Sequence, residues 1–251
     1  MPSNWPYLDH PGPIPFAHRG GASEHPENTL KAFQAAVDLG YRYLETDVHT
    51  TADGVLVAFH DDTLDRVTDR QGRIRELPWS TVREARIDGE PIPLLEDLLA
   101  SFPAARLNID AKHDTSVEPL VEVLRRTNSF DRVCIAAFSD RRLARVRRLT
   151  AQRVCTAAGP REIGQLRIGS FGIPAGTIGA ACVQVPPSIA GRPLVDRRFV
   201  DAAHRRHLQV HVWTIDHAPQ MERLLDLGVD GIMTDRPATL KEVLQGRGEW
   251  A

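Results

Sequence analysis

Cysteine is scarce in this chain of 251 residues, which contains only Cys134, Cys155 and Cys182. No two of them form a CxxC motif, and each lies in or beside an apolar run. This pattern argues against a disulfide framework and against a cysteine-based zinc site. We therefore expect all three cysteines to be buried as small apolar residues.

The chain also lacks an excess of basic residues, because its formal net charge is −2 at pH 7. That balance leaves no basic patch for nucleic acid. No GxGxxG or GxxxxGK[ST] motif is present, which weighs against a nucleotide-binding fold. No run approaches the ~18 apolar residues of a membrane span, and the first 15 residues lack the basic and apolar regions of a signal peptide. We expect a cytoplasmic protein without stable membrane insertion. A non-classical export route and the oligomeric state stay open.

Short apolar runs alternate with helix-period stretches through most of the chain. Residues 61–93 break this rhythm with turn signals, so we interpret them as a short insertion after strand two within one domain that spans 1–251. Eight strands, each followed by a helix, predict an α/β fold of the (β/α)₈ or TIM barrel type. An open doubly wound sheet is the second choice, because periodicity does not reveal closure. The expected strands are 14–18, 42–48, 106–112, 132–138, 153–158, 181–185, 209–214 and 230–234.

Two local signals refine the start of this pattern. A first helix is expected from Thr29 to Leu39, with Asn28 as its N-cap and Gly40 as its stop. The ADG turn at 52–54 predicts that the run 55–59 folds back on the second strand as a hairpin.

Carboxylates gather at the ends of two expected strands. Glu45 and Asp47 are two residues apart and therefore point to the same face, and Asp110 ends the third strand. In barrel enzymes the chemistry lies at the carboxyl ends of the strands. Oxygen ligands without cysteine favour a hard divalent cation, Mg²⁺ or Ca²⁺, over zinc. We predict that these three acids bind such an ion.

Two histidines end apolar runs on either side of these acids. His18 follows PFA and His60 follows VLVAF. Imidazoles give and take protons near neutral pH, so this pair is the candidate general acid and base. His211 shares a face with Trp213, and we expect it to pack in the core, with a position lining the barrel as the alternative. The other histidines singled out are expected at the surface or without an assigned role: His25, His49, His113, His204, His207 and His217.

Three further residues are candidates for binding a substrate. Arg19 can hold a phosphate through two parallel hydrogen bonds, and Lys112 can offset charge beside the metal. A salt bridge with a neighbouring carboxylate is the alternative role of either residue. Trp213 ends the seventh strand and offers a flat apolar wall, or packs at the barrel mouth.

These residues lie in motifs that resemble the glycerophosphodiester phosphodiesterase family, in its compact bacterial type. The motifs cover nearly the whole chain in the family's order: HRG at 18–20, PENT at 26–29, ETDV at 45–48, ADG…HD at 53–61, NIDAK at 108–112, VWTID at 212–216 and GVDGIMTDRP at 228–237. The resemblance implies a TIM barrel with an insertion after strand two. It also implies metal-dependent hydrolysis of small glycerophosphodiesters to glycerol 3-phosphate and an alcohol.

The resemblance also implies individual roles. His18 and His60 match the catalytic pair, Glu45 and Asp47 match two metal ligands, and Arg19 matches the phosphate contact. The family's third ligand is usually a glutamate in an ExK pattern. Asp110 stands there instead and is one methylene shorter, which leaves the identity of the metal open.

Two other functions remain as alternatives. A lysophospholipase D or sphingomyelinase-D-like activity on lipid substrates needs an apolar surface, and the segment 170–192 is apolar enough to supply one. A catalytically inactive barrel that only binds phosphodiesters would be expected to lack a histidine or a metal ligand, and none is lacking.

Overall fold

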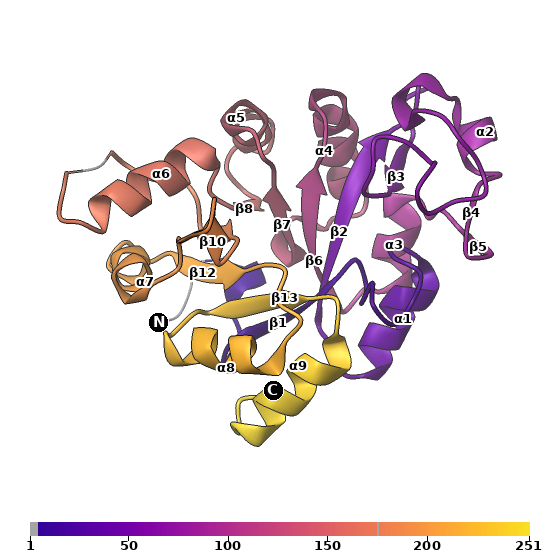
Figure 1. Cartoon of the computed structure of the whole chain (residues 1–251). Helices are drawn as coiled ribbons and strands as arrows, with labels where there is room; N and C mark the ends of the chain where they lie inside the picture. Colours follow the sequence, from indigo (N-terminus) through magenta and orange to yellow (C-terminus); the bar gives the residue numbers. More distant parts are fainter. Residues whose placement is uncertain (1–4, 175) are drawn as a thin grey trace.

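The centre of the molecule is a ring of parallel strands (Figure 1), in a computed structural model that describes residues 5–174 and 176–251. Every expected strand is present, and each strand boundary lies within two residues of its expected position. The order around the ring is β8-β7-β6-β2-β1-β13-β12-β9. The strands are β1 (Ile14–His18), β2 (Tyr43–Thr50), β6 (Arg106–Ala111), β7 (Val133–Ala136), β8 (Cys155–Thr156), β9 (Cys182–Val185), β12 (Gln209–Val212) and β13 (Gly231–Thr234).

The ring closes between β8 and β9. Ala157 forms a parallel bridge with Cys182. Next to it, the Ala158 amide donates to the Cys182 carbonyl at 2.8 Å, and the Ala181 amide donates to the Thr156 carbonyl at 3.0 Å. A closed ring leaves no free edge strand. The prediction of a barrel is therefore confirmed, and the open doubly wound sheet is wrong.

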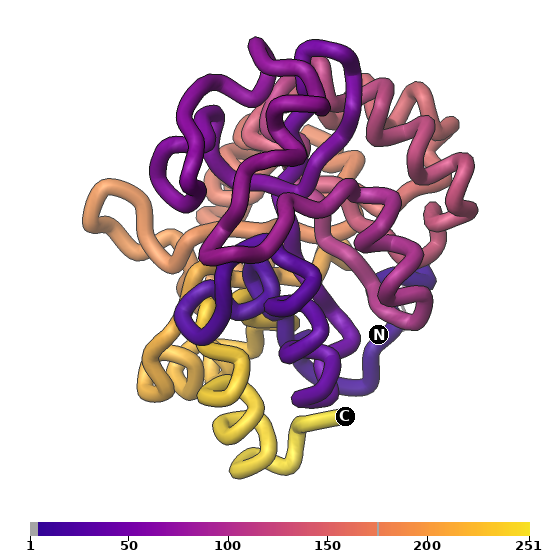
Figure 2. The backbone as a smooth tube through the Cα atoms, turned by 90° about the vertical axis from the view of Figure 1, so that its right-hand side faces the viewer, coloured from indigo at the N-terminus to yellow at the C-terminus, as the bar shows by residue number. Residues whose placement is uncertain are grey.

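The longer helices lie around the outside of the ring (Figures 1 and 2). In α4, apolar residues at 117, 120, 121 and 124 follow the helical repeat and are all buried. This spacing is why each helix covers the ring with one apolar face. The helices are α1 (Leu30–Asp38), α2 (Trp79–Val82), α3 (Leu95–Ser101), α4 (Val117–Arg126), α5 (Asp140–Leu149), α6 (Pro160–Gly169), α7 (Arg197–His204), α8 (Ala218–Asp226) and α9 (Pro237–Gly246).

The start of α1 differs from the prediction. Thr29, not Asn28, is the N-cap, and its hydroxyl accepts a hydrogen bond from the Ala32 amide at 3.2 Å. Asn28 adopts a left-handed φ of 57° and turns its amide toward Asp47. Both asparagine and threonine suit an N-cap. Because Asn28 forms hydrogen bonds within the site, Thr29 caps the helix. Gly40 ends the helix region with a φ of 99°, as expected.

Strand β2 continues beyond the ring as a hairpin with β3 (Leu56–Ala58), which confirms the predicted turn. Segment 61–93 follows β3 and contains the turn η2 (Ile74–Glu76), the short helix α2, and the small hairpin of β4 (Arg86–Ile87) and β5 (Glu90–Pro91). Its apolar side chains pack with those of β3 in a cluster of their own: Val57, Phe59, Leu64, Ile74, Val82, Ala85, Ile87 and Ile92. This segment and α9 lie at opposite ends of the molecule in Figure 2.

Large side chains fill the amino-terminal half of the barrel. The helical turn η1 (Pro6–Leu8) closes the floor, where the Tyr43 hydroxyl donates to the Tyr7 carbonyl at 2.8 Å. The three cysteines are free and buried there, and His211 is fully buried, as predicted. Among residues 5–174 and 176–251, no helix has both the length and the apolar character that crossing a membrane requires.

Candidate functional site

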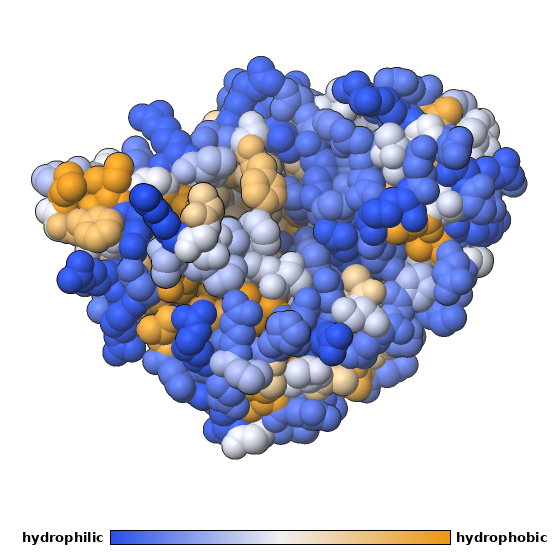
Figure 3. All heavy atoms as spheres, in the orientation of Figure 1, coloured by the Kyte–Doolittle hydropathy of each residue, from blue (hydrophilic) through white to orange (hydrophobic). Residues whose placement is uncertain are grey.

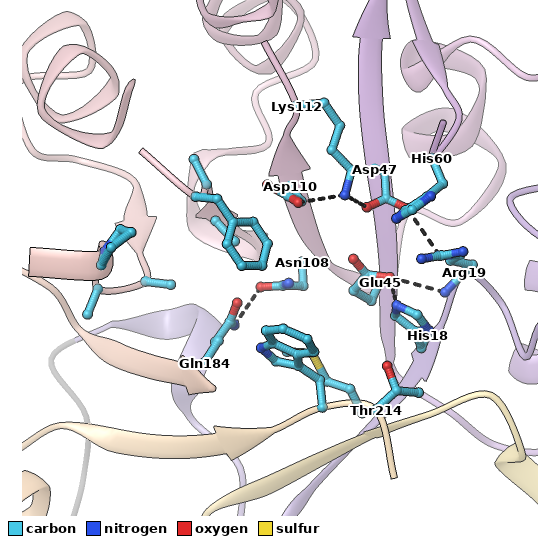
Figure 4. Close-up of a pocket in the computed structure, with 18 of the residues that line it drawn as sticks. His18, Arg19, Glu45, Asp47, His60, Asn108, Asp110, Lys112, Gln184 and Thr214 are labelled. Carbon is cyan, nitrogen blue, oxygen red and sulfur yellow. Dashed lines mark hydrogen bonds and ion pairs between the residues drawn. The ribbon is translucent and has the colours of Figure 1, made fainter. Parts of the chain in front are cut away.

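A cleft of about 180 Å³ opens at the carboxyl ends of the ring strands (Figure 4). One wall, from β1, β2, the end of β6 and the residues after β3 (Leu56–Ala58), carries the charged side chains. The other wall, from β7, β8 and β12, is mostly apolar. Every site residue expected from the sequence lines this cleft: His18, Arg19, Glu45, Asp47, His60, Asp110, Lys112 and Trp213.

His18 is held between two carboxylates. Its Nδ1 lies 2.6 Å from Oδ1 of Asp235, which follows β13, and its Nε2 lies 3.7 Å from Oε2 of Glu45. Burial alone would lower the pKa of His18, but Glu45 and Asp235 outweigh it and raise the pKa above its ordinary value. The Asp235 contact leaves Nε2 as the ring nitrogen that faces the cleft.

His60 is anchored in the same way by a different set of residues. Its Nδ1 lies 2.5 Å from Oδ1 of Asp61. Asp61 also accepts two hydrogen bonds from Arg66, at 2.5 and 3.0 Å, and these lower the pKa of Asp61 to about 2. Arg66 in turn binds Glu27 at 2.7 and 2.9 Å. The chain of contacts fixes the orientation of the His60 ring.

Three buried carboxylates and one ammonium group form the base of the charged wall. Lys112 Nζ lies 2.7 Å from Oδ1 of Asp47 and 2.8 Å from Oδ2 of Asp110. Glu45 stands on the same face of β2 and points into the cleft beside them (Figure 4). The acids do not all lie within 4.8 Å of one another, since Lys112 stands between two of them.

The electrostatics of these acids show an excess of negative charge. Burial and the neighbouring Asp47 raise the pKa of Glu45 to about 7. Burial raises the pKa of Asp110, and its Oδ1 is buried without a hydrogen-bond partner. Asp47 is also buried, but Lys112 and Arg19 hold its pKa below the ordinary value. An orphaned carboxylate oxygen among clustered acids fits the oxygen-rich ligand set of a hard divalent cation.

A tight turn after β1 brings Arg19 into the site. Its φ is 52°, and Gly20 follows with a φ of 83°, where a Cβ would lie 2.7 Å from that of Ala32. The Arg19 amide donates to Oε2 of Glu45 at 3.1 Å. Its guanidinium pairs with Glu27 at 3.1 Å and lies 3.4 Å from Asp47.

Both phosphate candidates therefore form ion pairs with neighbouring acids, which is the alternative role considered for them. Arg19 Nε is buried and makes no hydrogen bond, although it lies 3.4 Å from Oδ2 of Asp47. Lys112 Nζ lines the cleft while it contacts two carboxylates. Their roles toward a phosphate stay predictions.

The opposite wall is built from aromatic and small apolar side chains. Trp213 lies edge-on to Phe138, with ring centroids 5.7 Å apart. Phe138 is 66% exposed at the rim. Further exposed apolar side chains lie beyond this wall, on α6, on the loop that follows α6 and on the short strand β10 (Ser188–Ile189). They are Ile168, Phe171, Ile173 and Ile189. Figure 3 shows an apolar surface over α6.

Several residues shape the site although the sequence alone predicts no role for them there. Asn28 accepts a hydrogen bond from Thr46 at 2.8 Å and donates to Asp47 at 3.3 Å, so it orients a predicted metal ligand. Asp235 lies in the motif GVDGIMTDRP and Asn28 lies in the motif PENT. In the sequence, the motif is the only signal that indicates Asp235. Gln184 and Asn108 form a hydrogen bond of 2.7 Å on the cleft floor.

The expectation for His49 is corrected. The sequence predicts a surface position or no assigned role for His49, but this residue is 1% exposed and its Nε2 lies 2.9 Å from the His60 carbonyl oxygen. In the sequence, His49 comes directly after the expected second strand. In the structure, its imidazole is covered by the hairpin of β2 and β3 and by the start of segment 61–93. Burial lowers the pKa of His49 to about 4.

Comparison with known proteins gives one consistent result. Residues 18–239 match the glycerophosphoryl diester phosphodiesterase family model. The probable glycerophosphodiester phosphodiesterase 2 of Mycobacterium tuberculosis is 42% identical, over 97% of this chain and 95% of its own length. A lysophospholipase D of Homo sapiens is 29% identical, over 91% and 85% of the two chains.

Solved structures agree on the fold. A putative glycerophosphoryl diester phosphodiesterase from Silicibacter pomeroyi has a TM-score of 0.81 at 25% identity, and the match covers 98% of both chains. A phosphodiesterase from Oleispira antarctica, solved in complex with the product sn-glycerol-3-phosphate, has a TM-score of 0.79 at 23% identity, covering 93% of this chain and 97% of that one. With the family match and the 42% identical relative, these likenesses show that the chain belongs to the glycerophosphodiester phosphodiesterase family of phosphoric diester hydrolases.

Proposed function

We propose that this protein hydrolyses small glycerophosphodiesters to glycerol 3-phosphate and an alcohol, with His18 and His60 as the acid and base. The observation that carries the proposal is the pair of anchored imidazoles. The Nδ1 of each ring is hydrogen-bonded to a carboxylate, and both rings line one cleft beside the buried carboxylates of Glu45, Asp47 and Asp110. We also propose that the chain forms one barrel domain, with residues 61–93 as an insertion within it.

The two histidines differ in their surroundings, which supports different first roles. His18 faces Asp235 and Glu45, so its protonated form is favoured and it would donate a proton to the departing alcohol. His60 shares Asp61 with Arg66 and would accept a proton from the attacking oxygen. The attacking oxygen belongs to water or to the neighbouring glycerol hydroxyl. In either case the phosphorus–oxygen bond to the alcohol breaks and the alcohol leaves with the proton. Attack by water gives glycerol 3-phosphate directly, whereas attack by the glycerol hydroxyl gives a cyclic phosphate that a water molecule then opens to glycerol 3-phosphate.

The charged wall would bind and orient the phosphate. Arg19 and Lys112 would offset the negative charge that grows on the phosphate oxygens. Glu45, Asp47 and Asp110 would hold a divalent cation, for which Mg²⁺ and Ca²⁺ fit an all-oxygen ligand set. Such an ion, when bound, polarises a phosphate oxygen and neutralises charge.

The test is direct. Purified protein with Mg²⁺ or Ca²⁺ is incubated with glycerophosphocholine or glycerophosphoethanolamine, and glycerol 3-phosphate is measured with a coupled dehydrogenase. We expect turnover with at least one ion. No glycerol 3-phosphate above the enzyme-free rate, with either ion and either substrate, would overturn the proposal.

A second candidate is a lysophospholipase D activity. The exposed apolar side chains beyond Phe138 favour it, because an acyl chain needs such a surface, and three mammalian relatives carry that name. A comparison of kcat/KM for glycerophosphocholine and lysophosphatidylcholine separates the two. A strong preference for the acylated substrate would replace the first proposal by the second.

A further inference from the structure

A second cluster of candidate ligands lies at the edge of the cleft and has no part in the proposed reaction. It consists of His49, Asp62 and His113, whose ligand atoms all lie within 4.8 Å of one another. His49 is in β2, Asp62 is the second residue of segment 61–93, and His113 follows β6. Three separate segments therefore bring donor atoms to one point.

His49 is held as a ligand would be. It is almost fully buried, and its Nε2 lies 2.9 Å from the His60 carbonyl. A carbonyl only accepts, so Nε2 carries the hydrogen, and in the neutral ring the lone pair is on Nδ1. Histidines that bind metals usually donate their other ring N–H to a carbonyl or carboxylate in this way.

His113 and Asp62 complete the set. The Nε2 of His113 lies 2.9 Å from Oδ1 of Asp62, and the His113 ring packs edge-on to His49 with centroids 5.1 Å apart. Two donors bound to one ion at ~2.0–2.1 Å are themselves roughly 3 Å apart. A metal ion between His113 Nε2 and Asp62 Oδ1 could therefore take the place of the hydrogen in their hydrogen bond. The Asp62 side chain is 59% exposed, which gives an ion access from solvent.

The chemistry of the donors differs from that of the acid cluster. Imidazole nitrogens suit zinc and other transition metals, whereas sets made only of carboxylates suit magnesium and calcium. We propose that His49, Asp62 and His113 bind a divalent transition-metal ion of the zinc type, through three protein donors and one open position. The site is separate from the carboxylate set and does not depend on the proposed activity.

An ion at this site would have a structural effect. It would join the start of segment 61–93 to the barrel at β2 and at the turn after β6. Through the hydrogen bond from His49, it would also fix the main chain of His60. The chain contains a simpler histidine–aspartate pair for comparison: His204 Nε2 lies 2.7 Å from Asp230 Oδ2, and neither belongs to a group of three ligands among the residues described.

The experiment measures zinc binding to the full-length protein after removal of metals, in excess Mg²⁺ to fill the carboxylate set. Competition with a chromophoric chelator gives the affinity. We expect one zinc ion per chain, and an affinity at least ~10-fold lower in His113→Ala and in Asp62→Ala. Both side chains are at least partly exposed, so these variants are expected to fold. His204→Ala, the matched control, should bind zinc as the wild type does.

Two further readouts identify the site. X-ray absorption of the zinc-loaded wild type should show two imidazole ligands, and His113→Ala should lose one. Zinc should raise the Tm of the wild type and of His204→Ala but not that of His113→Ala. Wild-type zinc affinity in both His113→Ala and Asp62→Ala would overturn the proposal. An absorption spectrum of the wild type without imidazole ligands would do so too.

Discussion

The two walls of the cleft are built by different means. On the charged wall each group is held by another group: Asp235 holds His18, Asp61 holds His60, and Lys112 contacts two acids. On the apolar wall the side chains meet through ring and alkyl contacts, and the rim residue Phe138 is largely exposed. The comparison teaches that side chains held by hydrogen bonds and ion pairs lie on the wall where the phosphodiester bond would break. The apolar wall is held by non-polar contacts instead, so it could differ with the substrate.

This contrast corresponds to the order of the chain. The charged wall comes from β1, β2, the residues after β3 and the end of β6, and the apolar wall comes mainly from the later strands. Because β13 pairs with β1 in the sheet, Asp235, which follows β13, is the late residue that reaches the charged wall. Changes on the charged wall should therefore affect the reaction itself, and changes on the apolar wall should affect the choice of substrate.

The largest effect should come from removal of the divalent cation. Excess EDTA should abolish the hydrolysis of glycerophosphocholine, because the acid cluster would be left without its counter-ion. Addition of Mg²⁺ or Ca²⁺ beyond the chelator should restore the rate. Full activity in excess chelator would remove the metal from the mechanism.

Removal of either anchored imidazole should come next. His18→Ala and His60→Ala should each lower kcat by at least ~10²-fold, in line with a general acid–base role. Steady-state kinetics on glycerophosphocholine give the result, and His204→Ala serves as a histidine control outside the cleft. If both variants keep the wild-type kcat, the assignment of these two residues is wrong.

A smaller loss is expected in stability when the charge balance of the wall is broken. Lys112→Met leaves Asp47 and Asp110 without their ammonium partner, so the metal-free protein should lose about 3 kcal/mol of unfolding free energy. Urea unfolding in excess EDTA measures this. Arg125→Met, which breaks an exposed pair with Glu122, should cause little change. Equal effects of the two changes would contradict the account.

The contact between Asp235 and His18 should appear in the pH profile. The Asp235 carboxylate stabilises the imidazolium and so helps to raise the pKa of His18. Asp235→Asn should therefore lower that pKa, and the alkaline limb of kcat/KM should move to lower pH. The loss of rate should be smaller than that caused by removal of the ring. An unchanged alkaline limb would show that His18 is not the acid.

The smallest effect on the small substrate should come from the apolar wall. Phe138→Ser should change kcat/KM for glycerophosphocholine by less than about twofold, while kcat/KM for any turnover of lysophosphatidylcholine should fall by roughly tenfold. Parallel assays of the two substrates measure both. If the two substrates lose rate equally, the apolar wall does not select between them.

The sequence predicts the barrel because strand and helix periods are local properties. Every strand could be located from apolar runs of the right length, and the placement of His18 and Asp110 at strand ends follows from the topology. Glu45 lies inside the longer strand β2, where it pairs with His18 at the end of β1. Closure of the ring of strands could not be predicted from these patterns, because it depends on backbone hydrogen bonds between β8 and β9.

The missed residues depend on contacts between distant segments. Asp235 is 217 positions from His18, and only the pairing of β1 with β13 brings them together. Asn28 looks like an N-cap in the sequence, because asparagine is a common N-cap residue. The same side-chain amide can also donate a hydrogen bond to Asp47, which is what it does in the structure. The burial of His49 could not be predicted, because it requires the fold of the hairpin and of segment 61–93.

The most direct test is a crystal soaked with Ca²⁺ and glycerol 3-phosphate. The central claim predicts an anomalous peak bound by oxygens of Glu45, Asp47 and Asp110, with the phosphate within hydrogen-bonding reach of Nε2 of both His18 and His60. A calcium ion bound elsewhere, or a phosphate that reaches neither ring, would contradict the account.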